Sequence, residues 1–576
     1  MKFIVKWQSH DGDHCGAMRT RVLTSAALGS VLEWYDFSIF GFLAPQIGAA
    51  FFGGDNSAST ATLKAFCVYG GAFAMRPLGA LLFGHVGDGA GGRGRALSWA
   101  ILLMALPSLA IGCLPTYESA GRNATIALVV LRLVQGLSVG GQLAGAYVSV
   151  VEAAPPARRG LWGSLCSCGN SLGTALAALV IAGCTWALGG DGMEAWGWRL
   201  PFLLSGAVAP VAAGFLGREL CGDSDDERVE SARRAAQRSQ MLNESALDDG
   251  CCACGGAPAC VAARQHGGRV ALVCLAVASS GCTSYFVSTF LPTYLGALEK
   301  ESSGSRELSA SEVTASTCVV TTSTMVVLPV VGRLSDALGR VGFAIFAPVF
   351  GGDAATVRFS KLDAKDAVAL REAAAREKAA HMSRRHLMAL GYALVAALSP
   401  VGGYLLESEA FRHDFWKVVF VELGFSCVNA LSGACLAAFE VENFLHTGAA
   451  YTGVAISHNL AMALFGGTTP AVATALYEVR PLLPFGFVSF VACVSFAALS
   501  CLPLPASPCA RPPALVEKRA PLAKHRRANY DATAEEDPFL EPPPAPEPPR
   551  GIITRGAASR ATAAPSWAEG YDDLAR

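Results

Sequence analysis

Long apolar segments alternate with shorter polar ones along most of this chain. A helix that crosses a membrane needs about 20 mostly apolar residues. Segments of this kind lie at roughly 22–50, 63–86, 96–115, 125–151, 161–188, 198–218, 269–297, 313–332, 386–406, 415–439, 450–477 and 480–503. The pattern therefore predicts an all-α membrane protein with twelve transmembrane helices.

A polar stretch at 219–268 divides the predicted helices into two sets of six. Two similar halves joined by a long hydrophilic loop are typical of transporters built from repeats, whose substrate site lies near the membrane midplane between the repeats. We therefore expect an N-terminal six-helix half at 22–218 and a C-terminal six-helix half at 269–503, joined by a cytoplasmic central loop.

Three further segments fall outside the predicted membrane helices. Residues 1–21 form a polar N-terminal tail without the pattern of a removable signal. An insertion at about 341–385 interrupts the second half, and its charged, Ala-rich part predicts a surface helix. The tail at 504–576 is rich in Pro and charge, so it cannot build a core and is expected to be disordered.

Lys and Arg near the helix ends indicate how the helices are oriented. These residues are more frequent in the segments that lie inside if the N-terminus is cytoplasmic. An even number of helices then places both termini in the cytoplasm. We expect a monomeric, multi-pass protein of the plasma membrane, which in a bacterial host is the inner membrane.

The composition agrees with a membrane protein. Hydrophobic residues make up 52% of the chain and charged residues only 16%, whereas soluble proteins carry about 25% charged residues. The net charge of −1 provides no basic field for nucleic acid. The cytoplasmic "CCACGGAPAC" lacks the ligand spacing of a zinc site, and no P-loop is present. We therefore expect no metal, no cofactor and no enzymatic activity.

One short motif occurs once in each half. "GHVGDGAGGR" follows the second predicted helix and "GRLSDALGR" follows the eighth. The glycines permit a tight turn, and the Asp can face the N-terminus of a neighbouring helix and pair with Arg. We interpret the two copies as a latch on the inner side rather than as simple charged turns. The predicted gating residues are Gly84, Asp88, Gly91, Arg93, Gly332, Asp336, Gly339 and Arg340.

Several motifs resemble those of the major facilitator superfamily and, within it, the metabolite:proton symporter family of proline/betaine, α-ketoglutarate, shikimate and citrate carriers. They are "LEWYDF", "AMRPLGALLFGHVGD", "LRLVQGLSVGG", "EAAPPARRG", "WGWRLPF", "FLPTYL" and "YTGVAISHNLAMALFGGTTP", in the family's order. The resemblance implies the major facilitator fold and secondary transport coupled to protons. The chain departs from the family's pattern at Gln142, where a Glu is usual, so one membrane carboxylate is missing.

Two acids interrupt the first apolar segment. Glu33 and Asp36 are three residues apart and so lie on one face of a helix, and Arg76 of the second helix lies at a similar depth. Charges at mid-membrane are costly and tend to face a cavity or a partner. Our hypothesis is that both acids share a cavity with Arg76 and that one of them takes up the coupling proton. The alternative is a permanent ion pair between Glu33 and Arg76 that only holds the bundle together.

Other polar residues of the predicted helices are candidates for the substrate path. Arg132 opens the glycine-rich fourth helix, and the resemblance implies a role for it in proton transfer or gating, with packing as the alternative. Tyr35 and His458 could line the path or pack between helices. The full set of coupling and cavity candidates is Glu33, Asp36, Arg76, Arg132, Tyr35, Gln142, Glu422, His458 and Asn459.

These features predict a secondary active transporter that works by alternating access. Its partners are the lipid bilayer, a small organic acid or zwitterion as substrate, and protons moved in symport. Two alternatives stay open. The first is an uncoupled facilitator of sugars or other neutral solutes, which Gln142 favours, and the second is a transporter-like sensor, which the insertions and the Pro-rich tail favour.

Overall fold

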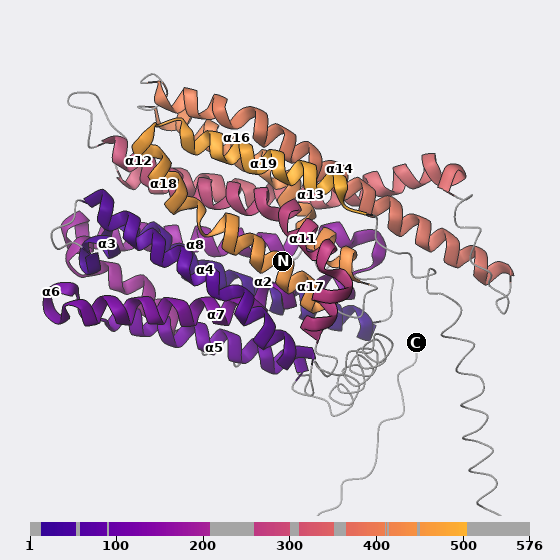
Figure 1. The fold of residues 1–576 in the computed structure, drawn as a ribbon, viewed down its shortest axis with the longest axis horizontal. Coiled ribbons are helices and arrows are strands. Elements are labelled where there is room, and N and C mark those ends of the chain that lie inside the picture. Colours follow the sequence, from indigo (N-terminus) through magenta and orange to yellow (C-terminus); the bar gives the residue numbers. More distant parts are fainter. Residues whose placement is uncertain are drawn as a thin grey trace, which may run out of the picture. The chain divides into compact units, whose positions relative to one another are not determined.

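The structure, a computed structural model, describes residues 13–52, 58–88, 92–207, 258–299, 310–350, 364–408, 411, 414–445 and 450–503. All regular elements within these ranges are helices (Figure 1). In the first half they are α2 (Asp13–Phe42), α3 (Ala44–Phe52), α4 (Ala58–Asp88), α5 (Gly92–Cys113), α6 (Tyr117–Ala120), α7 (Arg122–Ala153), η1 (Pro156–Arg158), α8 (Arg159–Ala195) and η2 (Gly197–Arg199). In the second half they are α11 (Pro258–Tyr285), η3 (Phe286–Phe290), α12 (Leu291–Glu299), α13 (Ala310–Phe350), α14 (Ala364–Glu407), α16 (Phe415–Phe444), α17 (Ala450–Ala461), η5 (Met462–Gly466), α18 (Thr469–Val479) and α19 (Leu483–Cys501).

Nine helical spans in the described part of the chain are long and apolar enough to cross a membrane. They are Thr60–Phe83, Arg122–Ala153, Pro156–Ala195, His266–Leu295, Ala315–Val341, Ala375–Glu407, Phe415–Phe444, Ala450–Val479 and Leu483–Cys501. Each overlaps one of the twelve predicted segments, which confirms an all-α membrane protein. Of the other three segments, the first corresponds to α2 with its two acids, the third contains the shorter apolar helix Leu102–Cys113, and the sixth runs beyond the described residues.

Helices α13 and α14 contain 41 and 44 residues. At about 1.5 Å per residue, each is longer than the apolar core of a bilayer, which is about 30 Å thick. The predicted insertion at 341–385 falls on their adjoining ends, apart from residues 351–363, which lie outside the described residues. The charged, Ala-rich segment is therefore continuous with the ninth predicted membrane helix and does not form a separate surface helix.

Glycines bring α4 and α7 into close contact, as the glycine-rich fourth segment predicts. A Cβ atom added at Gly136 would overlap the carbonyl oxygen of Ala72, and one added at Gly140 would overlap the carbonyl oxygen of Arg76. Small residues permit this close approach of two helix backbones. The contact fixes Arg76 on α4 relative to the polar residues of α7.

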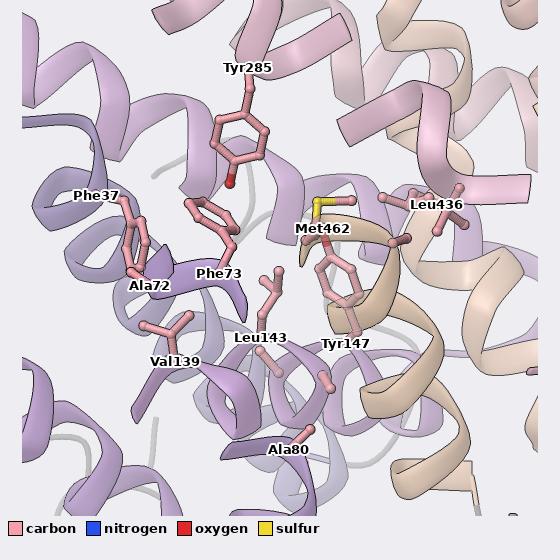
Figure 2. Close-up of a cluster of buried hydrophobic side chains, with 14 of the residues drawn as sticks. Phe37, Ala72, Phe73, Ala80, Val139, Leu143, Tyr147, Tyr285, Leu436 and Met462 are labelled. Carbon is pink, nitrogen blue, oxygen red and sulfur yellow. The ribbon is translucent and has the colours of Figure 1, made fainter. Parts of the chain in front are cut away.

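Several helices of the second half pack against the first, and α16 contacts α8. Helix α13 packs against α8, and α17 packs against α4 and α7. Between them lies an apolar cluster to which both halves contribute (Figure 2). Phe73 of the first half points at Tyr285 of the second, with ring centroids 5.1 Å apart and planes at 83°, and Tyr147 lies next to Met462.

Candidate functional site

A cavity of about 150 Å³ lies between the two halves. Helices α2, α7 and α8 line it from the first half, and α11, η3, α13, α16, α17 and η5 line it from the second. Ser and Thr hydroxyls from α8, α11 and α13 make up much of the lining. Among the residues that the structure describes, no Lys or Arg lines the cavity, and Glu422 is its only acid. The cavity is thus polar but carries little fixed charge.

An aromatic pair joins the two halves at this cavity. The ring of Trp34 on α2 stacks on the ring of Tyr285 on α11, with centroids 5.5 Å apart and planes at 13°. Both residues line the cavity, together with Tyr147 on α7. Beside Tyr285, Asn429 on α16 donates a hydrogen bond of 2.9 Å to the hydroxyl oxygen of Ser284. Aromatic faces of this kind can hold a quaternary or protonated amine through cation–π attraction.

His458 on α17 lines the inner part of the cavity and pairs with an acid that the sequence reasoning missed. Its Nδ1 lies 2.9 Å and 3.2 Å from the two carboxylate oxygens of Glu440 on α16. The ring also meets Tyr147 edge to face, with centroids 5.7 Å apart. The tenth predicted segment ends at residue 439, so Glu440 lies just outside it. The acids of "FEVENF" at its end were the available signal.

Asp36 lies in a polar network inside the first half. Its carboxylate accepts hydrogen bonds from Ser108 on α5, from Gln135 Nε2 on α7 at 2.9 Å and from Ser205 at 3.0 Å. Arg132 Nη1 donates to Gln135 Oε1 at 2.9 Å, so the arginine reaches Asp36 through the amide. All these side chains are buried. None of them lines the cavity.

Glu33 faces a different partner. Its Oε1 lies 4.0 Å from Arg76 Nη2, and both side chains are almost completely buried. Neither residue lines the cavity. Glu33, but not Asp36, therefore lies beside Arg76. The two acids share a helix face, yet they contact separate groups because α4 and α7 approach α2 from different sides.

Arg76 and Arg132 also contact aromatic rings, and they share Phe37. The guanidinium carbon of Arg76 lies 4.4 Å from the ring centroid of Phe37 and 4.0 Å from that of Phe73. The guanidinium carbon of Arg132 lies 3.9 Å from the ring centroid of Phe40 and 5.1 Å from that of Phe37. Both cations are therefore held by the ring faces as well as by the polar contacts.

The remaining candidates of the predicted set make backbone contacts. The Tyr35 hydroxyl donates to the carbonyl oxygen of Pro201 at 3.2 Å, and Gln142 Nε2 donates to the carbonyl oxygen of Gly29 at 2.8 Å. Asn459 Nδ2 donates across the halves to the carbonyl oxygen of Gly140 at 2.7 Å. The structure thus brings Glu422 and His458 of the predicted set to the cavity and places the others in the surrounding packing.

Asp336 on α13 faces the first turn of α8 in the other half. Its two carboxylate oxygens accept hydrogen bonds from the backbone N–H groups of Gly160 and Leu161, both at 2.9 Å. A helix N-terminus favours a negative charge, and Asp336 occupies such a position at the start of α8. Its arginine partner is Arg384 on α14, whose Nη2 lies 2.7 Å from Oδ1. Arg340 of the motif itself is exposed.

Further charged groups extend this latch. Arg384 Nη1 lies 2.5 Å from Glu442 Oε1, and His381 Nδ1 lies 3.1 Å from Glu442 Oε2. Arg159 of α8 pairs with Glu377 of α14. Two contacts therefore connect the second half to the start of α8: the backbone hydrogen bonds to Asp336 and the ion pair between Arg159 and Glu377.

The glycines of the same motif lie at close helix contacts. A Cβ atom at Gly332 would lie 2.7 Å from the carbonyl oxygen of Gly160, and one at Gly339 would lie 2.7 Å from the Cα atom of Ala380. The first copy of the motif lies largely outside the described residues: Gly91 is not described, nor are the side-chain surroundings of Gly84, Asp88 and Arg93.

Comparison with protein families gives one match over more than half of the chain. The sequence model of the Major Facilitator Superfamily matches residues 26–355. Solved structures agree at the level of the fold. The xylose transporter XylE from E. coli in a partially occluded inward-open conformation has a TM-score of 0.55 and 15% identity, over 84% of this chain and 98% of XylE.

Curated relatives carry transporter names. The glycine betaine/proline/ectoine/pipecolic acid transporter OusA of Dickeya dadantii is 32% identical over 333 residues, which are 57% of this chain and 62% of OusA. This match therefore spans less than two thirds of that relative. A putative proline/betaine transporter of Staphylococcus aureus strain N315 is 25% identical over 489 residues, which are 84% of this chain and 88% of that protein.

Proposed function

The chain belongs to the major facilitator superfamily, and from this premise we propose that it is a secondary transporter of a small zwitterion, driven by proton symport. The observation that carries the proposal is the polar cavity between the two halves, which is lined by hydroxyls and by the rings of Trp34 and Tyr285. Names of the relatives support the substrate class, since they are transporters of betaine, proline and ectoine.

The lining argues for a substrate with no net charge. A dicarboxylate would need cationic partners such as Arg, which bind carboxylates through paired hydrogen bonds. No Arg or Lys lines the cavity within the described residues, because Arg76 and Arg132 are held in the first half by acids, amides and rings. A zwitterion has no net charge, so each of its two charged groups can be stabilised by neutral polar or aromatic groups. Its ammonium group can lie on the aromatic faces, and its carboxylate can accept from the hydroxyls and from Asn429.

Alternating access follows from the contacts between the halves. The halves, which we place at 22–218 and 269–503, rock against each other around the cavity. On the inner side the latch of Asp336 and Arg384 holds α8 against the second half. Opening to the cytoplasm requires these hydrogen bonds and ion pairs to break, and closing restores them. The Trp34 and Tyr285 rings must separate when the cavity opens along the line where α2 meets α11.

We place the protein in the plasma membrane as a monomer, with both termini in the cytoplasm. In this orientation the latch lies on the cytoplasmic side, as do the adjoining ends of α13 and α14. Lys and Arg near the helix ends support the same orientation.

Uptake into proteoliposomes tests the function. Purified protein is reconstituted, and the accumulation of radiolabelled glycine betaine, proline, α-ketoglutarate and xylose is measured with and without an inwardly directed proton gradient. We expect accumulation of betaine or proline that depends on the gradient. Uptake of xylose that only equilibrates across the membrane would instead identify a facilitator of neutral solutes. Absence of flux for all four compounds would favour a sensor.

A further inference from the structure

Six carboxylates are buried within the described part of the chain. They are Glu33, Asp36, Asp336, Glu422, Glu440 and Glu442. Five of them have a partner: an arginine, a histidine, or a set of hydrogen-bond donors. The carboxylate oxygens of Glu33 and Glu422 have no hydrogen-bond partner among the described residues, and both residues are only 1% exposed. Glu33 has Arg76 at 4.0 Å, whereas Glu422 forms no ion pair within these ranges. Glu422 is thus the one buried acid of the described residues whose charge no protein group offsets.

Each buried charge of the first half within the described residues already has a partner, and Arg159 pairs with Glu377 of α14. The two acids of this half, Glu33 and Asp36, face two arginines, Arg76 and Arg132. Because each of these charges has an opposite charge nearby, no acid of this set needs to bind or release a proton. In the second half the latch acids pair with Arg384 and His381, and Glu440 pairs with His458. The uncompensated charge of the transport core therefore lies on Glu422.

The hydroxyls of α13 at this cavity are engaged with backbone carbonyl oxygens. Ser316 on α13 lies against Glu422 but donates its hydroxyl proton to the carbonyl oxygen of Val313 at 2.8 Å. Thr317, which lines the cavity on the same helix, donates to that carbonyl oxygen at 3.2 Å, and Thr321 donates to the carbonyl oxygen of Thr317. A neutral carboxylic acid can donate to these hydroxyl oxygens, whereas an ionised carboxylate gains a donor only if a hydroxyl such as that of Ser316 gives up its backbone hydrogen bond.

Charged groups of the surrounding helices are too distant or too exposed to compensate. On α16 itself, Glu440 and Glu442 follow Glu422 by 18 and 20 residues, which is about 27–30 Å along the helix. The buried partners of Glu440 and Glu442 lie at the C-terminal end of α16, away from Glu422. Lys417 on the outer end of α16 is 46% exposed and lies 3.7 Å from Asp414. The acids at the outer ends of the neighbouring helices, Glu312 on α13 and Glu407 on α14, are partly exposed. The other titratable side chains that line the cavity are Tyr147 on α7, Tyr285 on α11 and His458 on α17.

We propose that Glu422 carries the proton that is transported with the substrate. With the cavity open to the outside, its carboxylate takes a proton from hydronium and leaves a water molecule. The neutral acid then donates to a hydroxyl oxygen of α13, so that the loaded cavity can close without a buried charge. With the cavity open to the cytoplasm, the acid returns the proton to water. The inference rests on the proposed function of proton-coupled transport.

The test compares Glu422→Gln with wild type and with Glu478→Gln, a matched change of an exposed acid on α18. Two assays are run in proteoliposomes with glycine betaine and proline: accumulation driven by an inward gradient of one pH unit, and exchange of labelled for unlabelled substrate without a gradient. A gradient of one unit supports about tenfold accumulation for one proton per substrate. We expect Glu422→Gln to lose this accumulation while it keeps exchange, and to exchange at the same rate from acidic to neutral pH. Glu478→Gln should behave as wild type.

Several outcomes would overturn the inference. Wild-type-like accumulation by Glu422→Gln would do so, as would loss of exchange by a folded Glu422→Gln protein, because the residue would then serve translocation itself. Wild-type accumulation that needs Na⁺ and ignores the proton gradient would also exclude a coupling proton. If Glu422→Gln does not fold, Glu422→Asp serves as the test. It should retain accumulation, but the dependence of accumulation on pH should shift. An unchanged pH dependence contradicts the inference. A wild-type protein without any substrate flux would instead refute the proposed function.

Discussion

Asp336 on α13 accepts a hydrogen bond of 2.9 Å from the backbone N–H of Gly160 at the first turn of α8. The two residues belong to different halves of the protein and lie 176 positions apart in the chain. A negative charge at a helix N-terminus is stabilising, and here Arg384 is held against the same carboxylate. The contact between α13 and the start of α8 therefore depends on one carboxylate.

Replacement of that carboxylate should open the inner side. Removal of one partner from a buried charge network costs about 3–5 kcal/mol, so Asp336→Asn should leave Arg384 uncompensated and weaken the contact of α8 with α13. Cys168 on α8 reports on this contact, because its thiol lies 3.4 Å from the carbonyl oxygen of Met325 on α13. We expect faster thiol labelling of Cys168, measured by peptide mass spectrometry. Asp191→Asn, an exposed site on α8, serves as the control, and equal labelling rates in all three proteins would contradict the latch.

A single methyl group at Gly160 should disturb the same contact. The Cβ atom of Gly160→Ala would lie 2.7 Å from the carbonyl oxygen of Gly332 and 2.8 Å from Asp336 Oδ1. Overpacking typically costs about 1–3 kcal/mol, so the thermal unfolding temperature should fall. On the same helix, Gly183 has no neighbour within 4 Å of an added Cβ atom. Gly183→Ala should therefore leave the unfolding temperature nearly unchanged, and a similar fall for both variants would indicate a general loss of helix stability.

The aromatic pair should determine substrate affinity. Trp34→Ala removes one face of the stacked pair, and a desolvated cation–π contact is worth about 2 kcal/mol. We therefore expect the KM for glycine betaine uptake to rise by roughly 30-fold, with partial recovery in Trp34→Phe, which keeps an aromatic face. Trp186→Ala, at a position that is 90% exposed, is the matched control. An unchanged KM in Trp34→Ala would place the ammonium group elsewhere.

Glu33 and Arg76 should behave as a coupled pair in stability measurements. Each single change, Glu33→Gln or Arg76→Gln, leaves one buried charge without its partner and should lower the free energy of unfolding by about 3–5 kcal/mol. The double variant removes both charges and should recover much of that loss, as seen by thermal unfolding in detergent. If the two losses simply add, the 4.0 Å approach of the two groups contributes no coupling energy.

The proton hypothesis for the first helix can be separated from the inference about Glu422. The sequence suggests that Glu33 or Asp36 takes up the coupling proton, and this stays a prediction. Their fixed partners favour the alternative role in packing, because an acid that already accepts three hydrogen bonds, as Asp36 does, gains little from a proton. Proton-driven accumulation should therefore respond more strongly to Glu422→Gln than to Asp36→Asn.

The sequence by itself determined the membrane class and the apolar segments that form the long helices. Runs of apolar residues long enough to span a bilayer are a local property, so they could be read directly. The repeated motif likewise suggested Asp336 as a capping acid, since helix N-termini generally favour a negative charge. The glycines of the fourth segment predicted close helix packing for the same kind of reason.

Only the tertiary structure decided which of these groups meet. Arg384 and Glu442 reach Asp336 from helices that are distant in the chain, and the motif's own Arg340 points away into an exposed position. Glu33 and Asp36 share a helix face but contact different helices, so their spacing could not reveal that the structure separates them. Whether a buried acid has a partner depends on the packing of several helices at once. For that reason the unpartnered state of Glu422 could not be seen in the sequence.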